Sequence, residues 1–233
     1  MCAAVHNDGN YPPGIVGIAG SAGGIEALHE LLGILPADFP CPIVVAQHLG
    51  PRARYRSVLD RVLSSRTALC VKWAEDGEFL RPGFVLLAPQ DRHVEITPDR
   101  KVRLLQTEKL RGARPAADPL FASIASEYSR RGAGVVLSGA LDDGAEGAWQ
   151  IAVAGGRVLV QDRGTSLLDA MPSAAIRTGA VHFELSPEMI ARALITLAMA
   201  PGAAAWFQVW PKALKRPIRL SPAPLFLKGD AVR

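Results

Sequence analysis

The sequence predicts an α/β protein with a doubly wound, mostly parallel sheet, a Rossmann-like three-layer sandwich that also contains an antiparallel hairpin. Continuously apolar runs of strand length alternate with segments whose apolar residues recur at helical spacing, which is typical of β-α-β units. The composition, 49% hydrophobic and 21% charged, is that of a globular chain and excludes collagen, coiled coil and overall disorder. A length of 233 residues suits one domain with an appendage, since domains usually run to roughly 100–200 residues.

The first strand and helix show the pattern most clearly. Residues 15–19 are apolar throughout, as in a strand buried on both faces, and a Gly-rich turn follows them. Apolar residues then share one helical face at Ile25, Leu28, Leu32 and Leu35. Further strands are expected at 43–46, 69–73, 84–88, 134–138 and 157–160, and a hairpin at 93–97 and 102–105. Further helices are expected over the apolar positions from Tyr55 to Leu63, after Gly144 and from Ser186. Another helix is expected at Asp118-Pro119, with Asp118 as N-cap and Pro119 as first helical residue.

Charge divides the chain into a neutral body and a basic tail. Residues 201–233 contain six Lys or Arg and one acidic residue, whereas residues 1–200 contain 20 basic and 21 acidic residues. We therefore expect an N-terminal extension over 1–13, a main globular domain over 14–200 and a basic, proline-rich tail over 201–233. Because the body is neutral, nucleic acid is not an expected partner.

Targeting signals and cysteines suggest a cytoplasmic protein. The N-terminus shows no secretory signal, and no apolar stretch reaches the roughly 20 residues of a membrane span, so stable membrane insertion is not expected. The three cysteines, Cys2, Cys41 and Cys70, are scattered and lack metal-ligand spacing.

Three strands carry a reactive side chain at or just beyond their carboxyl ends. These side chains are Ser21, His48 and Asp143. In open α/β sheets ligands bind at this edge, so separate strands bring such groups together. A serine needs a base to take its proton, and an imidazole needs a carboxylate to fix its tautomer. Glycines around Ser21 would allow a tight turn and close substrate approach, and amides at the start of the next helix would face an oxyanion.

The residues alone leave other interpretations open. A Gly-rich strand-to-helix turn also occurs in dinucleotide-binding folds, although these place an acidic residue where this chain has Gln47-His48. A lone histidine at a strand end is often structural, and Asp142-Asp143-Gly144 would also serve as a helix cap.

An ordered set of motifs resembles the catalytic domain of the CheB protein-glutamate methylesterases. The motifs cover roughly residues 14–198 and comprise residues 17–24, 47–48, 74–78, 88–93, 137–144 and 171–172. The resemblance implies hydrolysis of glutamyl methyl esters on cytoplasmic helices of chemoreceptors or other signalling proteins, with deamidation of glutamines as a second activity. It also implies that Ser21 is the nucleophile, His48 the base and Asp143 the orienting acid, with no cofactor and no metal.

This chain departs from the family pattern near the implied site. Ala22 stands where Thr or Ser is common, and the family's Gly-Met-Gly-Asn-Asp-Gly loop reads Gly-Ala-Leu-Asp-Asp-Gly at residues 139–144. Asp142 adds a carboxylate that we expect to favour the imidazolium form of His48 or to compete for that ring. A non-catalytic docking module that binds receptor-like helices therefore remains the alternative, and a dinucleotide-binding oxidoreductase is a weaker third.

Other matching positions receive no catalytic role. His93 is interpreted as substrate-side or structural, Arg114 as a solvated loop arginine, and Met171 as lining the cleft or starting a helix. In the family a receiver domain precedes the catalytic domain, whereas about fourteen residues precede the first strand here. We therefore expect no gating by an attached receiver, and a regulator acting in trans becomes a candidate partner.

Overall fold

The computed structural model describes residues 14–49 and 58–199, which contain nine strands and six α-helices. The strands are β1 (Ile15–Gly20), β2 (Ile43–Gln47), β3 (Cys70–Trp73), β4 (Phe84–Leu87), β5 (His93–Ile96), β6 (Val102–Leu105), β7 (Gly132–Val136), β8 (Arg157–Gln161) and β9 (Phe183–Leu185). The helices are α1 (Gly24–Ile34), α2 (Leu59–Ser64), α3 (Ala117–Tyr128), α4 (Ala145–Val153), α5 (Ala170–Arg177) and α6 (Pro187–Met199).

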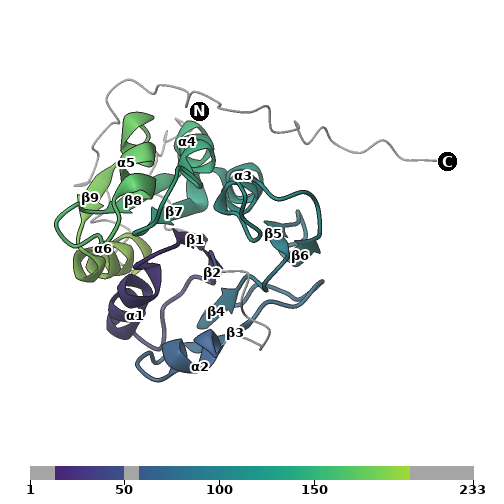
Figure 1. Cartoon of the computed structure of the whole chain (residues 1–233). Helices are drawn as coiled ribbons and strands as arrows, with labels where there is room; N and C mark the ends of the chain where they lie inside the picture. The colour runs from purple at the N-terminus through teal and green to yellow at the C-terminus, as the bar shows by residue number, and fades with distance from the viewer. Residues whose placement is uncertain (1–13, 50–57, 200–233) are drawn as a thin grey trace, which may run out of the picture.

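Seven strands form one parallel sheet in the order β3-β4-β2-β1-β7-β8-β9, and β5 and β6 form a separate antiparallel hairpin. Helices α3, α4 and α5 cover one face of the sheet, and α1, α2 and α6 cover the other (Figure 1). The predicted doubly wound sandwich with a hairpin is confirmed.

Burial on both faces explains the apolar strands. Every residue of β1, β2 and β7 is buried, because helices pack on both sides of a parallel sheet. Side chains alternate between the two faces: Ile18 and Val45 pack with Leu28 of α1, whereas Val44 packs with Phe121 of α3. The two resulting cores hold the central strand ends in place.

Strand order reverses at β1. From β1 the chain proceeds to β2, then to β3 at the edge of the sheet and to β4 between β2 and β3, and it later returns to β7 on the opposite side of β1. Such a switch point leaves a crevice at the carboxyl ends of the two central strands, where open α/β folds bind their ligands.

The predicted elements are found with small shifts, and one helix start is wrong. The strand expected at 134–138 spans Gly132–Val136. Helix α3 begins at Ala117, so Asp118 lies inside its first turn and is not its N-cap. Strand β9 was not predicted, because three residues are too short for a clear pattern. Residues 1–13, the tail from 201 and the expected helical position Tyr55 lie outside the described residues.

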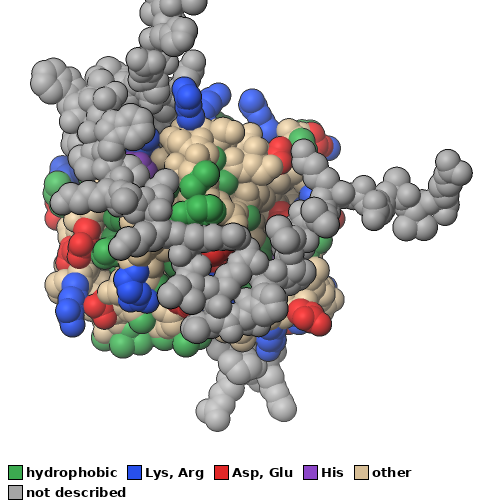
Figure 2. Space-filling view, turned by 90° about the horizontal axis from the view of Figure 1, so that it is seen from above, with side chains coloured by type: hydrophobic (Ala, Val, Ile, Leu, Met, Phe, Trp, Pro, Cys, Tyr) green, Lys and Arg blue, Asp and Glu red, His purple; other side chains and the backbone are tan. Residues whose placement is uncertain are grey.

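Two surface properties concern possible partners. None of the helices in the described ranges has the length and apolar character needed to cross a membrane. On the face shown in Figure 2, Lys and Arg side chains are interspersed with Asp and Glu, so the described residues of this face form no patch of one charge.

Candidate active site

Strand register places Ser21 beside His48. Gly20 is paired with Gln47 across β1 and β2, and Ser21 and His48 are the next residues of the two strands. The His48 amide donates to the Gly20 carbonyl at 2.9 Å, which extends the pairing past the end of β2. Neighbouring strands lie about 4.8 Å apart, so the predicted nucleophile and base occupy adjacent positions at the sheet edge.

His48 is paired with Asp143. Its Nε2 atom lies 2.7 Å from Asp143 Oδ2, and the side chains are 15% and 0% exposed. A carboxylate only accepts hydrogen bonds, so this contact assigns the proton of the neutral ring to Nε2. The lone pair of Nδ1 is then free to accept a proton, which is the property that a general base requires.

Helix α3 holds the Asp143 carboxylate from the other side. Oδ2 accepts the Ala117 amide at 2.7 Å, and Oδ1 accepts the Asp118 amide at 3.2 Å. These are the first two residues of the helix, whose N-terminus carries a partial positive charge. The helix therefore stabilises a buried carboxylate and fixes its orientation toward His48.

Gln47 joins the backbones of the two reactive residues. Its buried Nε2 donates to the carbonyl of Ser21 at 2.8 Å and to that of His48 at 3.2 Å. A Cβ atom on either Gly20 or Gly24 would lie 2.6 Å from Gln47 Oε1. These glycines thus make room for the Gln47 carboxamide, which corrects the expectation that they leave space for substrate.

Ser138 is a site residue that sequence reasoning did not single out. Its Oγ donates to the Ala22 carbonyl at 2.7 Å and accepts the Leu168 amide at 3.0 Å. Its carbonyl accepts the Ser21 amide at 3.0 Å, and its own amide donates to Gln161 Oε1 at 2.8 Å. This buried serine connects the loops that follow β1, β7 and β8, and its position within the motif at 137–144 was the only signal for it.

Gly139 packs closely against Ser21, the predicted nucleophile. A Cβ atom at Gly139 would lie 2.8 Å from Ser21 Cβ and 2.1 Å from Met171 Sδ. Met171 is fully buried in the first turn of α5. Met171 therefore lies at the start of helix α5 and also packs against Gly139, next to Ser21.

Asp142 does not compete for His48. Its Oδ2 accepts a hydrogen bond from Nη1 of Arg111, and Nε of the same arginine lies 3.3 Å from Asp118 Oδ2. The expectation that Asp142 competes for the His48 ring is therefore wrong, because Asp142 is hydrogen-bonded to Arg111 instead.

His93 and Arg114 have structural contacts. His93 Nδ1 accepts the Ala116 amide at 3.1 Å, so Nε2 carries the proton that it donates to the Glu108 carbonyl at 3.0 Å. Burial lowers the pKa of His93, consistent with a neutral ring. The guanidinium of Arg114 donates to Asp91 and to the Thr107 carbonyl, and this side chain is 16% exposed, so it is not a solvated loop arginine.

Three exposed leucines belong to the loops that carry the site. Leu141, Leu167 and Leu168 are 61%, 72% and 43% exposed. Leu167 lies against the nucleophile turn, since a Cβ on Gly23 would lie 2.6 Å from Leu167 Cβ. Leu141 is two residues from Gly139. Apolar side chains therefore border the region around Ser21.

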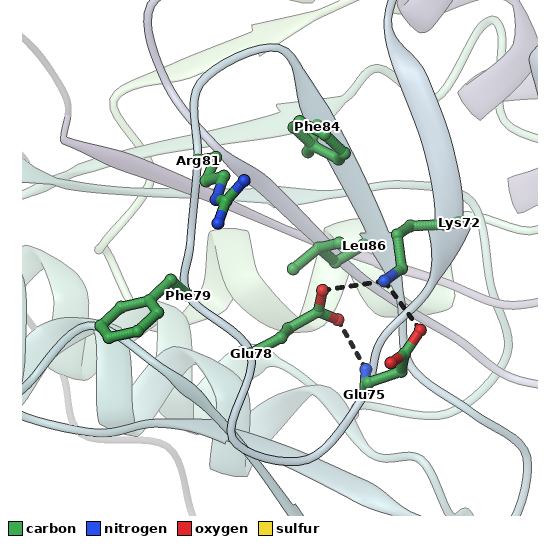
Figure 3. A pocket seen from close by; sticks show the side chains of 7 residues that line it. All are labelled: Lys72, Glu75, Glu78, Phe79, Arg81, Phe84 and Leu86. Carbon is green, nitrogen blue, oxygen red and sulfur yellow. Dashed lines mark hydrogen bonds and ion pairs between the residues drawn. The ribbon is translucent and has the colours of Figure 1, made fainter.

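A separate hollow of about 230 Å³ lies beside β3 and β4 (Figure 3). Lys72 reaches across it to Glu75 at 2.8 Å and to Glu78 at 3.0 Å. Phe79, Arg81 and Phe84 also line it, and the predicted catalytic residues do not. Within the described ranges, no group of three or more His, Cys, Asp or Glu side chains is arranged to hold a metal ion.

Comparison with known proteins identifies the family. Residues 16–194 match the family model described as CheB methylesterase. The chain belongs to the CheB methylesterase family. It is 39% identical over 170 residues to protein-glutamate methylesterase/protein-glutamine glutaminase 4 of Myxococcus xanthus, and the match covers 73% of this chain and 48% of that protein. Compared with several such CheB-family relatives, this chain spans about half of their length.

Two further CheB-family relatives match over nearly their whole length. A putative protein-glutamate methylesterase/protein-glutamine glutaminase of Leptospira interrogans is 37% identical over 188 residues, covering 81% of this chain and 95% of that protein. The crystal structure of the Thermotoga maritima CheB methylesterase catalytic domain aligns with a TM-score of 0.76 and 35% identity. That alignment covers 80% of this chain and all of the crystallised domain.

Proposed function

We propose that this CheB-family protein is a serine methylesterase that hydrolyses glutamyl methyl esters on cytoplasmic helices of chemoreceptor-like signalling proteins. The observation that carries the proposal is the part-buried contact between His48 and Asp143 next to Ser21. The names of its relatives, protein-glutamate methylesterase/protein-glutamine glutaminase, support the same substrate bond, and we propose that this protein acts in the cytoplasm.

Acylation uses the tautomer that Asp143 enforces. Ser21 Oγ attacks the ester carbonyl, and its proton passes to Nδ1 of His48. Asp143 stabilises the resulting imidazolium through Nε2–H. When the tetrahedral intermediate collapses, the carbon–methoxy bond breaks and the same proton leaves with methanol. The product of this half-reaction is a glutamyl ester of Ser21.

The developing oxyanion needs donors that the fold has not already used. The Ser21 amide donates to Ser138 and the Gly24 amide donates to the Ser21 carbonyl at 2.9 Å. Within the described residues, the amides of Ala22 and Gly23 have no acceptor. Gly23 has a φ of 79°, a left-handed conformation that glycine adopts without strain. We assign the oxyanion to these two amides, which replaces the expected amides of the helix itself.

Deacylation repeats the sequence with water as the nucleophile. His48 takes a proton from water, the carbon–Oγ bond breaks, and the proton returns to Ser21 while a glutamate is released. A glutamine side chain would follow the same path with ammonia as the leaving group, so deamidation requires no additional residue.

The direct test is methanol release from carboxymethylated chemoreceptor membranes. Ser21→Ala should lower the rate at least ~10³-fold, because no other group at the site replaces the nucleophile. Its thermal unfolding midpoint should stay within about 2 °C of wild type, since this turn hydroxyl contributes little to stability. Ser126→Ala, at an exposed position on α3, is the matched control and should retain full activity. Wild-type turnover by Ser21→Ala would refute the proposed nucleophile.

The departures at Ala22, Ala140 and Asp142 favour one alternative, a docking module that binds receptor-like helices without turnover. A folded protein that co-sediments with methylated receptor membranes but releases no methanol would support this module. Release of methanol that depends on Ser21 would exclude it.

A further inference from the structure

The predicted triad acid, Asp143, belongs to a cluster of three carboxylates. Asp142 and Asp143 are adjacent in the loop after β7, and Asp118 lies in the first turn of α3. The Asp118 amide donates to Asp143 Oδ1, so the two elements meet at the acid itself. Such a concentration of negative charge favours the protonated form of a neighbouring imidazole.

Arg111 is the cation of this cluster. It contacts both Asp142 and Asp118, and its side chain is 23% exposed, compared with 29% for Asp142 and 16% for Asp118. Partial burial alone would lower the pKa of Arg111, but the carboxylates of Asp118 and Asp142 outweigh it and raise that pKa. The arginine is therefore charged, and it joins the loop before α3 to the loop after β7.

The backbone presents Arg111 for this contact. Arg111 has a φ of 50°, which is uncommon for a residue with a side chain, and it lies in a tight turn closed by Leu110 and Ala113. The Leu110 amide donates to the Ala113 carbonyl at 3.1 Å, and the Ala113 amide donates to the Leu110 carbonyl at 2.8 Å. A left-handed residue with a side chain is strained and persists only where surrounding contacts hold it.

Asp118 shows that the carboxylates influence one another. Burial and the charge of Asp143 raise the pKa of Asp118 to about 7, although the Gly147 amide and Arg111 act in the opposite direction. The neutral form of Asp118 is therefore favoured more than that of an exposed carboxyl. Arg111 contacts both carboxylates, Asp142 through Nη1 and Asp118 through Nε.

Three other titratable or charged side chains lie near this cluster. His93 lies close enough for Asp143 and Arg114 to affect it, but both of its ring nitrogens are hydrogen-bonded and burial lowers its pKa. Arg114 is paired with Asp91. Glu146, three residues after Asp143 in the chain, is buried in the first turn of α4.

We propose that Arg111 is a positioning residue that holds Asp142 away from His48 and offsets its charge, thereby setting the pH above which His48 can act as a base. The catalytic interpretation rests on the proposed function, whereas the effect on His48 itself does not. Arg111 acts through Asp142 and Asp118 and has no direct contact with the reacting atoms. Without it, Asp142 adds an uncompensated charge to the loop that contains Asp143.

The first test measures the protonation of His48 by NMR of the histidine rings, with the signal assigned by its loss in His48→Gln. In Arg111→Gln the titration midpoint of His48 should rise by roughly 0.5–1 pH unit, because the imidazolium form gains stabilisation. In this variant Asp118 loses its cationic partner and takes up a proton more readily, which limits the rise of the His48 midpoint. Arg111→Lys retains the charge and should keep the midpoint within about 0.2 unit of wild type.

A double variant separates charge from disrupted structure. Arg111→Gln combined with Asp142→Asn removes both partners and installs the asparagine that is usual in the family, so the midpoint should return toward the wild-type value. Arg103→Gln is the matched control, since it breaks a pair with Glu95, at 3.6 Å, in the hairpin. It should leave the midpoint unchanged.

The same variants are then assayed for methanol release across pH. The acid side of the pH profile of kcat/KM for Arg111→Gln should move to higher pH by the same amount as the NMR titration midpoint. The value of kcat/KM at high pH should stay within about threefold of wild type. An unchanged His48 midpoint in folded Arg111→Gln, or a shift that Asp142→Asn does not reverse, would overturn the role of Arg111. A shifted midpoint in a protein without esterase activity would instead count against the proposed function alone.

Discussion

Asp143 Oδ2 accepts the backbone amide of Ala117 at 2.7 Å, so the predicted triad acid also caps helix α3. The residue that precedes the helix, Ala116, has no side-chain oxygen to fill this role. One carboxylate thus satisfies the start of a helix and orients His48. Stability and the proposed catalysis are therefore expected to be coupled at this residue.

Asparagine substitutions separate the two adjacent aspartates. Asp143→Asn should lower kcat by about 10³–10⁴-fold, because the neutral amide cannot stabilise the imidazolium or enforce the productive tautomer. Asp142→Asn should change kcat less than about fivefold, since Asp142 contacts Arg111 and not His48. Steady-state methanol release on both variants checks this ranking, and the opposite ranking would show that Asp142 is the acid.

The strands, their parallel arrangement and the triad positions could be predicted from local patterns. Apolar runs identify buried strands, and parallel neighbours bring Ser21 and His48 to one edge. The cap of α3 could not be predicted, because Asp143 is 26 residues away from Ala117 in sequence. For the same reason, the spacing of Gly20 and Gly24 predicts a turn but does not show that Gln47 fills the space beside it.

Gln47→Leu tests the link between the backbones of Ser21 and His48. Leucine is close in size but donates no hydrogen bond, so both carbonyl contacts are lost. We expect kcat to fall roughly 10–100-fold with KM changed less than threefold, because the reacting groups are misplaced while the outer surface is kept. Gln150→Leu on α4 is the control for a glutamine outside these contacts. Equal effects of the two variants on kcat would contradict the positioning role.

Gly139→Ala tests the close approach behind the nucleophile. The new Cβ would lie 2.1 Å from Met171 Sδ and 2.8 Å from Ser21 Cβ, so the variant should lose stability by roughly 1–3 kcal/mol and most of its activity. Adding Met171→Ala removes the first clash and should recover part of the overpacking cost. Activity should stay low, because Ser21 remains displaced. Urea unfolding and methanol release on the single and double variants check this; recovery of activity together with stability would show that Met171 alone conveys the effect.

His182 predicts how the stability of the fold depends on pH. Its Nδ1 accepts the Val158 amide at 3.2 Å, and burial, followed by the charge of Arg157, lowers the pKa of His182 to about 4 from the ordinary 6.5. Between these values the unfolded chain binds more protons than the native protein, so this contribution is fully present above pH 6.5 and is lost as pH falls toward 4.

His182→Gln should therefore flatten the acid side of the stability profile. Glutamine can accept the Val158 amide through its carbonyl oxygen but does not titrate, so the decrease between pH 6.5 and 4 should be smaller by up to roughly 3 kcal/mol than in wild type. Urea unfolding at about pH 7, 5.5 and 4.5 measures the difference in the free energy of unfolding between the two proteins. Parallel profiles would mean that His182 is protonated as readily in the native protein as in the unfolded chain.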